Sequence, residues 1–280
     1  MMRPAPGTDP TPSPASSSSP RLLEVSDLVV TFQRPSGLLG LRSTPVRVVD
    51  DVSLGLESGA TLGLVGESGS GKTTLARAVL RLIEPDAGSV RLGGIEVLSL
   101  APAPLRALRR RMQLVFQDPR SSLNPRMRCG DAVREGLEIH RLARGAEAEA
   151  RVRRLFDEVG LPADAVHRWP HELSGGQRQR VGIARALAVD PELLICDEPV
   201  SALDVSVQAQ VLNLLADLQR RRNLAMLFIS HDLAVVRHLA SRVAVMYRGR
   251  IVEEGPIDKV YGAPQDPYTQ RLIAAVPRGI

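Results

Sequence analysis

The stretch LVGESGSGKTT, from Leu64 to Thr74, decides the fold class of this chain. Residues Gly66–Thr73 match the pattern G-x-x-x-x-G-K-[ST] at every fixed position. An apolar run, Ala60–Val65, precedes the loop, and a helical pattern, Thr74–Ile83, follows it. The pattern is informative in this strand–loop–helix context. The stretch therefore predicts an α/β unit whose loop binds phosphate.

Each fixed residue type of the loop suits phosphate. Glycines let backbone N–H groups curl around phosphate oxygens, and the following helix adds the positive end of its dipole. We expect Lys72 to bridge the β- and γ-phosphates and Thr73 to offer its hydroxyl to Mg²⁺. A flexible Gly/Ser loop is the alternative, but a chance match occurs in roughly one chain in a hundred. The predicted nucleotide-binding residues of the loop are Gly66, Glu67, Ser68, Gly69, Ser70, Gly71, Lys72, Thr73 and Thr74.

Further apolar runs extend this unit into a sheet. They are too short for buried helices, and near-continuous runs are typical of parallel strands covered on both faces. Between them, Ser206–Arg220 has helical periodicity with its leucines and valines on one face. This alternation predicts an α/β fold with a doubly wound, phosphate-loop (RecA-like) core. The expected strands are Ala60–Val65, Glu192–Cys196, Leu224–Ser230 and Arg242–Tyr247.

Two segments break the alternation. Residues Leu22–Gly59 carry alternating apolar positions and predict an antiparallel β layer. Residues from about 118 to 175 have few β-rich runs and show helical patterns at Asp131–Arg141 and Ala146–Val159. We interpret this second segment as a helical subdomain inserted into the α/β core.

Composition sets the outer limits. The 280 residues are 44% hydrophobic and 24% charged, which allows one large α/β domain with a sizeable core. Residues 1–20 contain six of the 21 prolines and predict a disordered tail. That leaves residues 21–280 for the folded domain, with a C-terminal extension from about residue 248. The net charge of +5 favours a solubilising surface.

Nothing in the sequence predicts membrane insertion or secretion. The chain has no run of 18 apolar residues, and its N-terminus lacks the apolar segment of a secretory signal. The two cysteines, Cys129 and Cys196, suggest no disulfide framework. We therefore expect a cytoplasmic protein that contacts a membrane only through a partner.

A second motif, LLICDEPVSALD, spans Leu193 to Asp204. Its apolar strand leads directly into Asp197 and Glu198, and buried carboxylates are costly unless a cation meets them. Beside a phosphate loop, Asp197 is suited to hold the Mg²⁺ of a bound nucleotide. Glu198 is suited to polarise a water for attack on the γ-phosphate. A helix cap is the alternative for two acids after a strand, and the phosphate loop argues against it.

A third motif, LSGGQRQR, spans Leu173 to Arg180. Ser174, Gly175 and Gly176 would open a helix whose N–H donors form a second phosphate site. A plain turn or cap is the alternative. Together with the two motifs above, this stretch resembles the ABC-type ATPases, and the resemblance runs from about Leu22 to Pro277.

The resemblance implies roles for further residues. In that family the LSGGQ motif covers the γ-phosphate of ATP bound to another subunit, so two copies enclose two nucleotides head to tail. Gln117 in LVFQDP matches a contact to Mg²⁺ and water, and His231 in FISHD matches a γ-phosphate contact. Phe32 is a candidate for stacking on adenine, with a core position as the alternative. The nucleotide-site residues that the resemblance adds are Phe32, Ser174, Gly175, Gly176, Gln177 and Asp204. The implied metal ligands are Thr73, Gln117 and Asp197, and the implied catalytic residues are Lys72, Gln117, Glu198 and His231.

Two more stretches resemble the oligopeptide, dipeptide and nickel importer ATPases: LVFQDPRSSLNPR (Leu114–Arg126) and PQDPYTQRLIAAVP (Pro264–Pro277). This resemblance implies an ATP-hydrolysing subunit that powers import of peptides or similar small solutes. The implied partners are integral-membrane permease subunits, a second ATPase subunit that is a paralogue or a second copy, and indirectly an extracytoplasmic solute-binding protein. The resemblance also implies that the chain lies at the cytoplasmic face of the inner membrane. Docking to the permeases would then involve Gln117–Met127 and the helical subdomain.

One departure and two alternatives qualify this assignment. Many of these importer ATPases carry a Cys-rich tail proposed to hold an iron–sulfur cluster or metal; here no cysteine follows Cys196, so we expect neither. The ATPase of carbon–phosphorus lyase, which belongs to a soluble complex, is an alternative. A nucleic-acid-associated ABC ATPase is another, because Arg106–Arg154 is rich in arginine. Aromatic residues make up only 3% of the chain, so we expect no nucleic acid.

Overall fold

The computed structural model describes residues 21–36, 42–118 and 123–275; the tail predicted at residues 1–20 lies outside this range. The larger of its two sheets has the strand order β10-β9-β3-β8-β7-β6. Neighbouring strands are parallel except at the edge, where β10 runs antiparallel to β9. The strands are β3 (Thr61–Val65), β6 (Met112–Val115), β7 (Leu193–Asp197), β8 (Ala225–Ser230), β9 (Arg242–Tyr247) and β10 (Arg250–Pro256).

The strands predicted for this sheet are confirmed, with each end within one residue of its expected position. In β7, Leu194 and Cys196 pack into one core, while Leu193 and Ile195 pack into the other. Burial on both faces explains why the apolar run is continuous rather than alternating. The sequence does not predict β6 or β10, since β6 has four residues and β10 is a partly charged edge strand.

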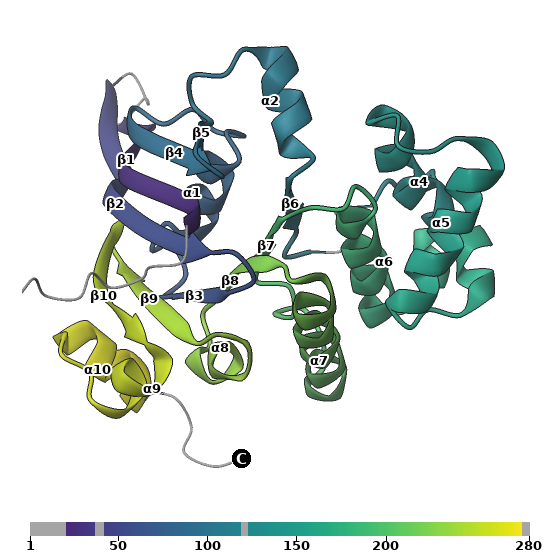
Figure 1. The fold of residues 1–280 in the computed structure, drawn as a ribbon. Helices are drawn as coiled ribbons and strands as arrows, with labels where there is room; N and C mark the ends of the chain where they lie inside the picture. The colour runs from purple at the N-terminus through teal and green to yellow at the C-terminus, as the bar shows by residue number, and fades with distance from the viewer. Residues whose placement is uncertain (1–20, 37–41, 119–122, 276–280) are drawn as a thin grey trace, which may run out of the picture.

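The smaller sheet is antiparallel, with the order β2-β1-β4-β5. Strands β1 (Arg21–Ser36) and β2 (Arg42–Glu57) form the predicted β layer. Strands β4 (Ala87–Leu92) and β5 (Ile95–Glu96) extend it, which the sequence does not predict. Figure 1 shows this layer against one side of the main sheet, and helix α1 (Lys72–Val79) packs into the core that the two sheets share.

The helix expected at Thr74–Ile83 is displaced in the structure. It begins at Lys72, directly after Gly71, and ends at Val79. Arg81 takes a left-handed conformation with φ of 51°, which a helix cannot continue. The Arg81 guanidinium also donates a 2.6 Å hydrogen bond to the Leu100 carbonyl, a tertiary contact just beyond the end of the helix.

Helices cover the opposite face of the main sheet. They are α6 (Gly175–Leu187), α7 (Val205–Arg222) and α8 (Leu233–Leu239). The helix predicted at Ser206–Arg220 is confirmed as α7, which ends at Asn223 in a left-handed conformation. Short helix α2 (Pro102–Arg109) leads from the antiparallel sheet into β6.

The remaining helices form two groups. Between β6 and β7, α4 (Cys129–Ile139) and α5 (Gly145–Glu158) lie near the two helical patterns that the sequence predicts, followed by 3-10 turns at Ala163–His167 and Pro170–Glu172. Figure 1 shows α4, α5 and α6 clustered to one side of the sheets. After β10, α9 (Ile257–Gly262) and α10 (Pro267–Ala274) pack beside the main sheet.

The domain boundaries drawn from the sequence stay predictions. In the part of the chain described, no helix is long and apolar enough to span a membrane.

Candidate functional site

The phosphate loop connects β3 to α1 and is wedged between other strands. A Cβ atom on Gly66 would lie 2.1 Å from the Met246 carbonyl oxygen of β9. A Cβ atom on Gly71 would lie 2.4 Å from the Val48 carbonyl oxygen of β2, and Gly71 has a φ of 111°. Both positions therefore need glycine because strands approach the loop, independently of any ligand.

Lys72 lies at the start of α1 with its side chain folded under the loop. Its residue is only 4% exposed, and Nζ donates to the carbonyl oxygens of Gly66 at 2.8 Å and Glu67 at 2.9 Å. Burial lowers the pKa of Lys72, and the carboxylates of Glu198 and Asp197 oppose this shift. The ammonium is thus held by neutral carbonyls that a phosphate oxygen can replace.

Asp197 ends β7 within hydrogen-bonding distance of Thr73, the last residue of the phosphate-loop motif. The Thr73 hydroxyl donates a 3.0 Å hydrogen bond to Oδ1 of Asp197. Burial raises the pKa of Asp197, while the Thr73 hydrogen bond lowers it. A hydroxyl and a buried carboxylate side by side are hard oxygen ligands of the kind that Mg²⁺ prefers. This pair fits the predicted metal site.

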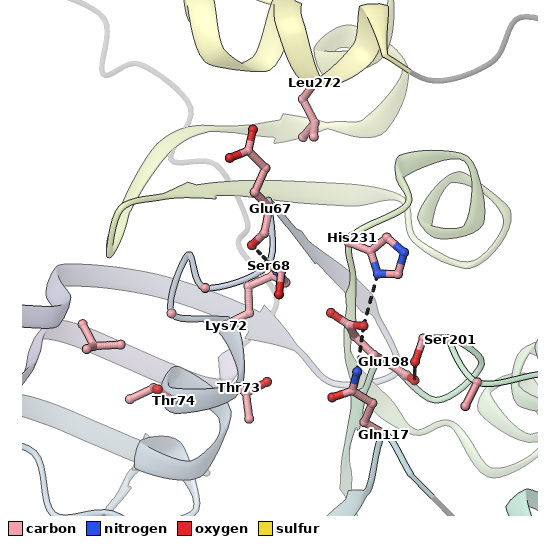
Figure 2. Close-up of a pocket in the computed structure, with 14 residues that line it drawn as sticks. Glu67, Ser68, Lys72, Thr73, Thr74, Gln117, Glu198, Ser201, His231 and Leu272 are labelled. Carbon is pink, nitrogen blue, oxygen red and sulfur yellow. Dashed lines mark hydrogen bonds and ion pairs between the residues drawn. The ribbon is translucent and has the colours of Figure 1, made fainter. Parts of the chain in front are cut away.

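Glu198 follows at the point where the chain turns away from the sheet. Its φ of 45° is left-handed, and its backbone N–H donates to the Ile229 carbonyl of β8 at 3.0 Å. Gln117 Nε2 donates to Oε2 of Glu198 at 3.2 Å, and His231 Nδ1 lies 3.1 Å from the same oxygen. Figure 2 shows the three side chains converging from separate segments. Because both contacts use Oε2, Oε1 stays available to a water.

These residues line one cavity of about 720 Å³. The structure brings ten predicted residues to its walls: Glu67, Ser68, Gly69, Gly71, Lys72, Thr73, Thr74, Gln117, Glu198 and His231. Sequence reasoning missed four others: Val48, Ser201, Ala202 and Leu272. Small and apolar wall residues carry no local signal of their own. Ser201 also donates to the Glu198 carbonyl oxygen at 3.1 Å, which supports the turn that presents Glu198.

The LSGGQ motif opens a different helix, α6, and does not line this cavity. Ser174 caps α6: its Oγ accepts from the Gln177 backbone N–H at 3.3 Å, while Gln177 Oε1 accepts from the Ser174 N–H at 3.0 Å. Ser174 and Gly175 are exposed, and so is Asp204 at the start of α7. A Cβ on Gly176 would lie 2.4 Å from Val207 Cγ1, so this glycine allows α7 to approach α6.

Phe32 lies on β1, paired with Val46 of β2. It is 42% exposed, so the alternative of a core position is wrong. It does not line the cavity, whose wall on this side is Val48. Its role as an adenine contact stays a prediction.

With this geometry in view, comparisons with known proteins decide the family. Residues 49–201, more than half of the chain, match the model of the ABC transporter family. This chain belongs to the ABC transporter ATP-binding family. The ABC subunit is therefore an ATP-binding protein and an ATPase, as the three motifs predict.

Relatives and solved structures agree with this assignment. The ABC subunit is 53% identical over 84% of its length to a putative peptide import ATP-binding protein of Brucella ovis, covering 74% of that protein. It is 53% identical over 91% of its length to the glutathione import ATP-binding protein GsiA of Escherichia coli, but spans only 41% of it. The dimeric ATP-binding cassette MJ0796 bound to ADP and Pi superposes with a TM-score of 0.73 at 27% identity, over 84% of this chain and 98% of that one. The structure of cbiO1 from Clostridium perfringens, 24% identical with a TM-score of 0.75 over 87% and 91% of the two chains, supports the fold alone.

Proposed function

We propose that this ABC ATPase powers the import of peptides or similar small solutes through separate membrane subunits. The observation that carries the ATPase part is the cavity in which the phosphate loop, Glu198, Gln117 and His231 meet, with Asp197 bonded to Thr73 of its wall. The solute class rests on the relatives, which are named for peptide import and for glutathione import. Glutathione is itself a short peptide, so both names support one class of solute.

ATP and Mg²⁺ fit the residues present. Lys72 would exchange its hydrogen bonds to the Gly66 and Glu67 carbonyls for bonds to phosphate oxygens. Thr73 and Asp197 would hold Mg²⁺, joined by Gln117, which lines the same cavity as Thr73. Bound there, Mg²⁺ would neutralise charge on the β- and γ-phosphate oxygens.

Asp197→Asn tests the metal site. The amide keeps the shape of the side chain but removes the charge that attracts Mg²⁺, so both MgATP affinity and turnover should fall. Nucleotide affinity measured with EDTA should change much less, because the phosphate loop is intact. Equal affinities of parent and variant for MgATP would argue against Asp197 as a metal ligand.

Glu198 is the proposed general base. It would accept a proton from the attacking water while the water oxygen bonds to the γ-phosphorus. The bond between the γ-phosphorus and the oxygen bridging to the β-phosphate breaks, which yields ADP and phosphate. Gln117 and His231 orient the carboxylate through Oε2, and both lie on the cavity wall where they can also reach the γ-phosphate.

A second ATPase subunit is the proposed partner of the exposed LSGGQ motif. Ser174 and Gly175 stand at the N-terminus of α6, where backbone N–H groups can bind phosphate. They do not face the cavity of their own chain, so they would cover a nucleotide on another subunit. The cassette MJ0796 was solved as a dimer, which supports this arrangement.

The permease subunits have a proposed docking place of their own. A groove of about 300 Å³ lies between β6 and the helices α2, α4 and α6. Its rim carries the exposed apolar side chains Leu82, Phe116 and Ile139, and Phe116 directly precedes Gln117. We propose that a short cytoplasmic helix of a permease inserts its apolar face here, which would hold the subunit at the cytoplasmic side of the inner membrane. Part of the stretch predicted to dock, residues 119–122, lies outside the described residues.

Crosslinking tests the docking surface. A cysteine at Ile139 should crosslink to a permease in membrane vesicles, and the matched control at Val46, an exposed residue of the antiparallel sheet, should not. Crosslinks from Val46 alone would place the permease on the antiparallel sheet and contradict the proposed docking surface.

Reconstitution tests the proposed function as a whole. Vesicles containing the ABC subunit, its permeases and a solute-binding protein should take up short peptides only when ATP is supplied on the side of this subunit. Isolation of the subunit in a complex without membrane proteins would favour the soluble, lyase-type alternative. A shift of DNA or RNA on gels at physiological salt would favour the nucleic-acid alternative.

A further inference from the structure

The C-terminal helix α10 contacts the phosphate loop directly. The Tyr268 hydroxyl accepts a 2.8 Å hydrogen bond from the Glu67 backbone N–H, across 201 residues of sequence. Tyr268 is 4% exposed, and its ring stacks on Tyr247 of β9 with a centroid separation of 4.1 Å. The hydroxyl is therefore held against the loop by a rigid aromatic pair.

This contact acts on the same peptide unit that holds Lys72. The N–H of Glu67 and the carbonyl of Gly66 belong to one planar amide, so fixing one end fixes the direction of the other. Lys72 Nζ donates to that carbonyl at 2.8 Å. Tyr268 and Lys72 thus hydrogen-bond to the two ends of a single amide, one to its N–H and the other to its carbonyl.

Helix α10 is itself anchored to the main sheet. Asp266 caps it by accepting from the Tyr268 backbone N–H at 2.7 Å. Glu253 of β10 accepts from the backbone N–H groups of Gln265 at 2.9 Å and Asp266 at 3.0 Å. One turn beyond Tyr268, Leu272 lines the nucleotide cavity, as Figure 2 shows. Helix α10 therefore contributes Leu272 to the cavity wall and Tyr268 to the loop beside it.

From these contacts we infer that Tyr268 is a positioning residue for nucleotide binding, which it serves by holding the Gly66–Glu67 amide in place. This inference rests on the proposed role of Lys72 as a phosphate ligand. When Lys72 turns to ATP, the Gly66 carbonyl loses its donor, and the Tyr268 hydroxyl remains as the side-chain hydrogen bond on that amide. A rotated amide would present its carbonyl dipole differently to the incoming phosphates. Loss of the Tyr268 hydroxyl should thus weaken the binding of ATP rather than slow the chemical step.

Tyr268→Phe isolates the hydroxyl, because the ring can still stack on Tyr247. We expect KM for ATP in the reconstituted transporter to rise about 5- to 20-fold, within the range for a partly buried N–H that loses its partner. We expect kcat at saturating ATP to change by less than about twofold, the signature of a loss in binding alone. The affinities of the purified subunit for ATP and ADP should fall together, because both nucleotides fill the loop.

Tyr247→Phe is the matched control. It removes a hydroxyl from the other ring of the same stack, and that hydroxyl makes no hydrogen bond to the phosphate loop within the described residues. Its KM should stay within about twofold of the parent. A lower unfolding midpoint for Tyr268→Phe with unchanged KM would mean that the hydroxyl supports only the fold, and would overturn the inference. Failure of the parent protein to bind ATP would instead refute the proposed role of the loop, so the two failures are distinguishable.

Discussion

The phosphate loop and the LSGGQ motif look alike in sequence but differ in the structure. Both are short Ser/Gly stretches that open a helix, α1 at Lys72 and α6 at Gly175. The first opens into a cavity of about 720 Å³ with Lys72 and Glu198 on its walls. The second is capped by its own Ser174 and faces outward. A helix N-terminus can serve as a catalytic site only where charged groups from other segments meet it, and among the described residues the phosphate loop meets such groups while the LSGGQ motif does not.

The largest expected effect comes from a substitution in the phosphate-loop cavity. Glu198→Gln keeps the hydrogen-bonding shape but removes the charge that polarises water, so turnover should fall by about 10²–10⁴-fold. MgATP binding should survive, and an ATP-dependent closed assembly should accumulate in the reconstituted transporter. Turnover at the parent rate would show that Glu198 is not the base. Adding Lys72→Ala, which removes the proposed phosphate ligand, should abolish the accumulation.

The next largest effect comes from a substitution in the LSGGQ motif. Ser174→Arg places a bulky cation at the exposed end of α6, so turnover of the assembly should fall by about 10²-fold, the lower range for losing one preorganised donor. The affinity of the isolated subunit for MgATP should be unchanged, since Ser174 does not line its own cavity. A matching loss of affinity in the isolated subunit would contradict the division between the two regions.

A smaller effect separates packing from binding at the LSGGQ motif. Gly176→Ala should lower the free energy of unfolding by about 1–3 kcal/mol, because the new Cβ would meet Val207 at 2.4 Å. Val207→Ala in the same chain should restore part of the loss. Gly182→Ala is the control on the same helix: nothing lies within 4 Å of its Cβ position, so stability should stay equal or rise. Chemical denaturation measures all three variants.

The smallest effect concerns how the helical group is joined to the core. Arg222 at the end of α7 donates to both carboxylate oxygens of Glu158 on α5, at 2.8 and 2.6 Å. This contact lowers the pKa of Glu158 from its usual value of 4.5. A carboxylate whose pKa is lower in the folded state stabilises the protein above its unfolded pKa and loses that contribution as pH falls through the folded pKa.

Glu158→Gln should therefore lower the free energy of unfolding by about 1 kcal/mol at pH 7. The difference from the parent should be complete above about pH 4.5 and shrink as the pH falls below it. Glu149→Gln on the same helix is the control, since its pair with Arg153 is exposed and its effect should be smaller. A difference that grows toward acid pH would contradict the assignment.

Sequence reasoning succeeded where the signal is local. The loop residues Gly66–Thr73 and the strand that ends at Asp197 follow from residue type and order, because phosphate and buried strands each demand a particular local pattern. It failed where local signal is weak. Strand β5 has two residues, and α1 ends before Arg81, whose left-handed backbone and hydrogen bond to Leu100 no periodicity predicts.

The sequence by itself determined the family, the order along the chain of the candidate site residues from Lys72 to His231, and the residue types suited to phosphate. Only the tertiary structure decided that Tyr268 bonds to the loop and Leu272 lines the cavity from helix α10, that Phe32 is exposed rather than buried, and that Ser174 does not line the cavity of Lys72. The physical reason is that a motif encodes what a local backbone can bind, whereas partners brought together across 201 residues depend on how sheets and helices pack.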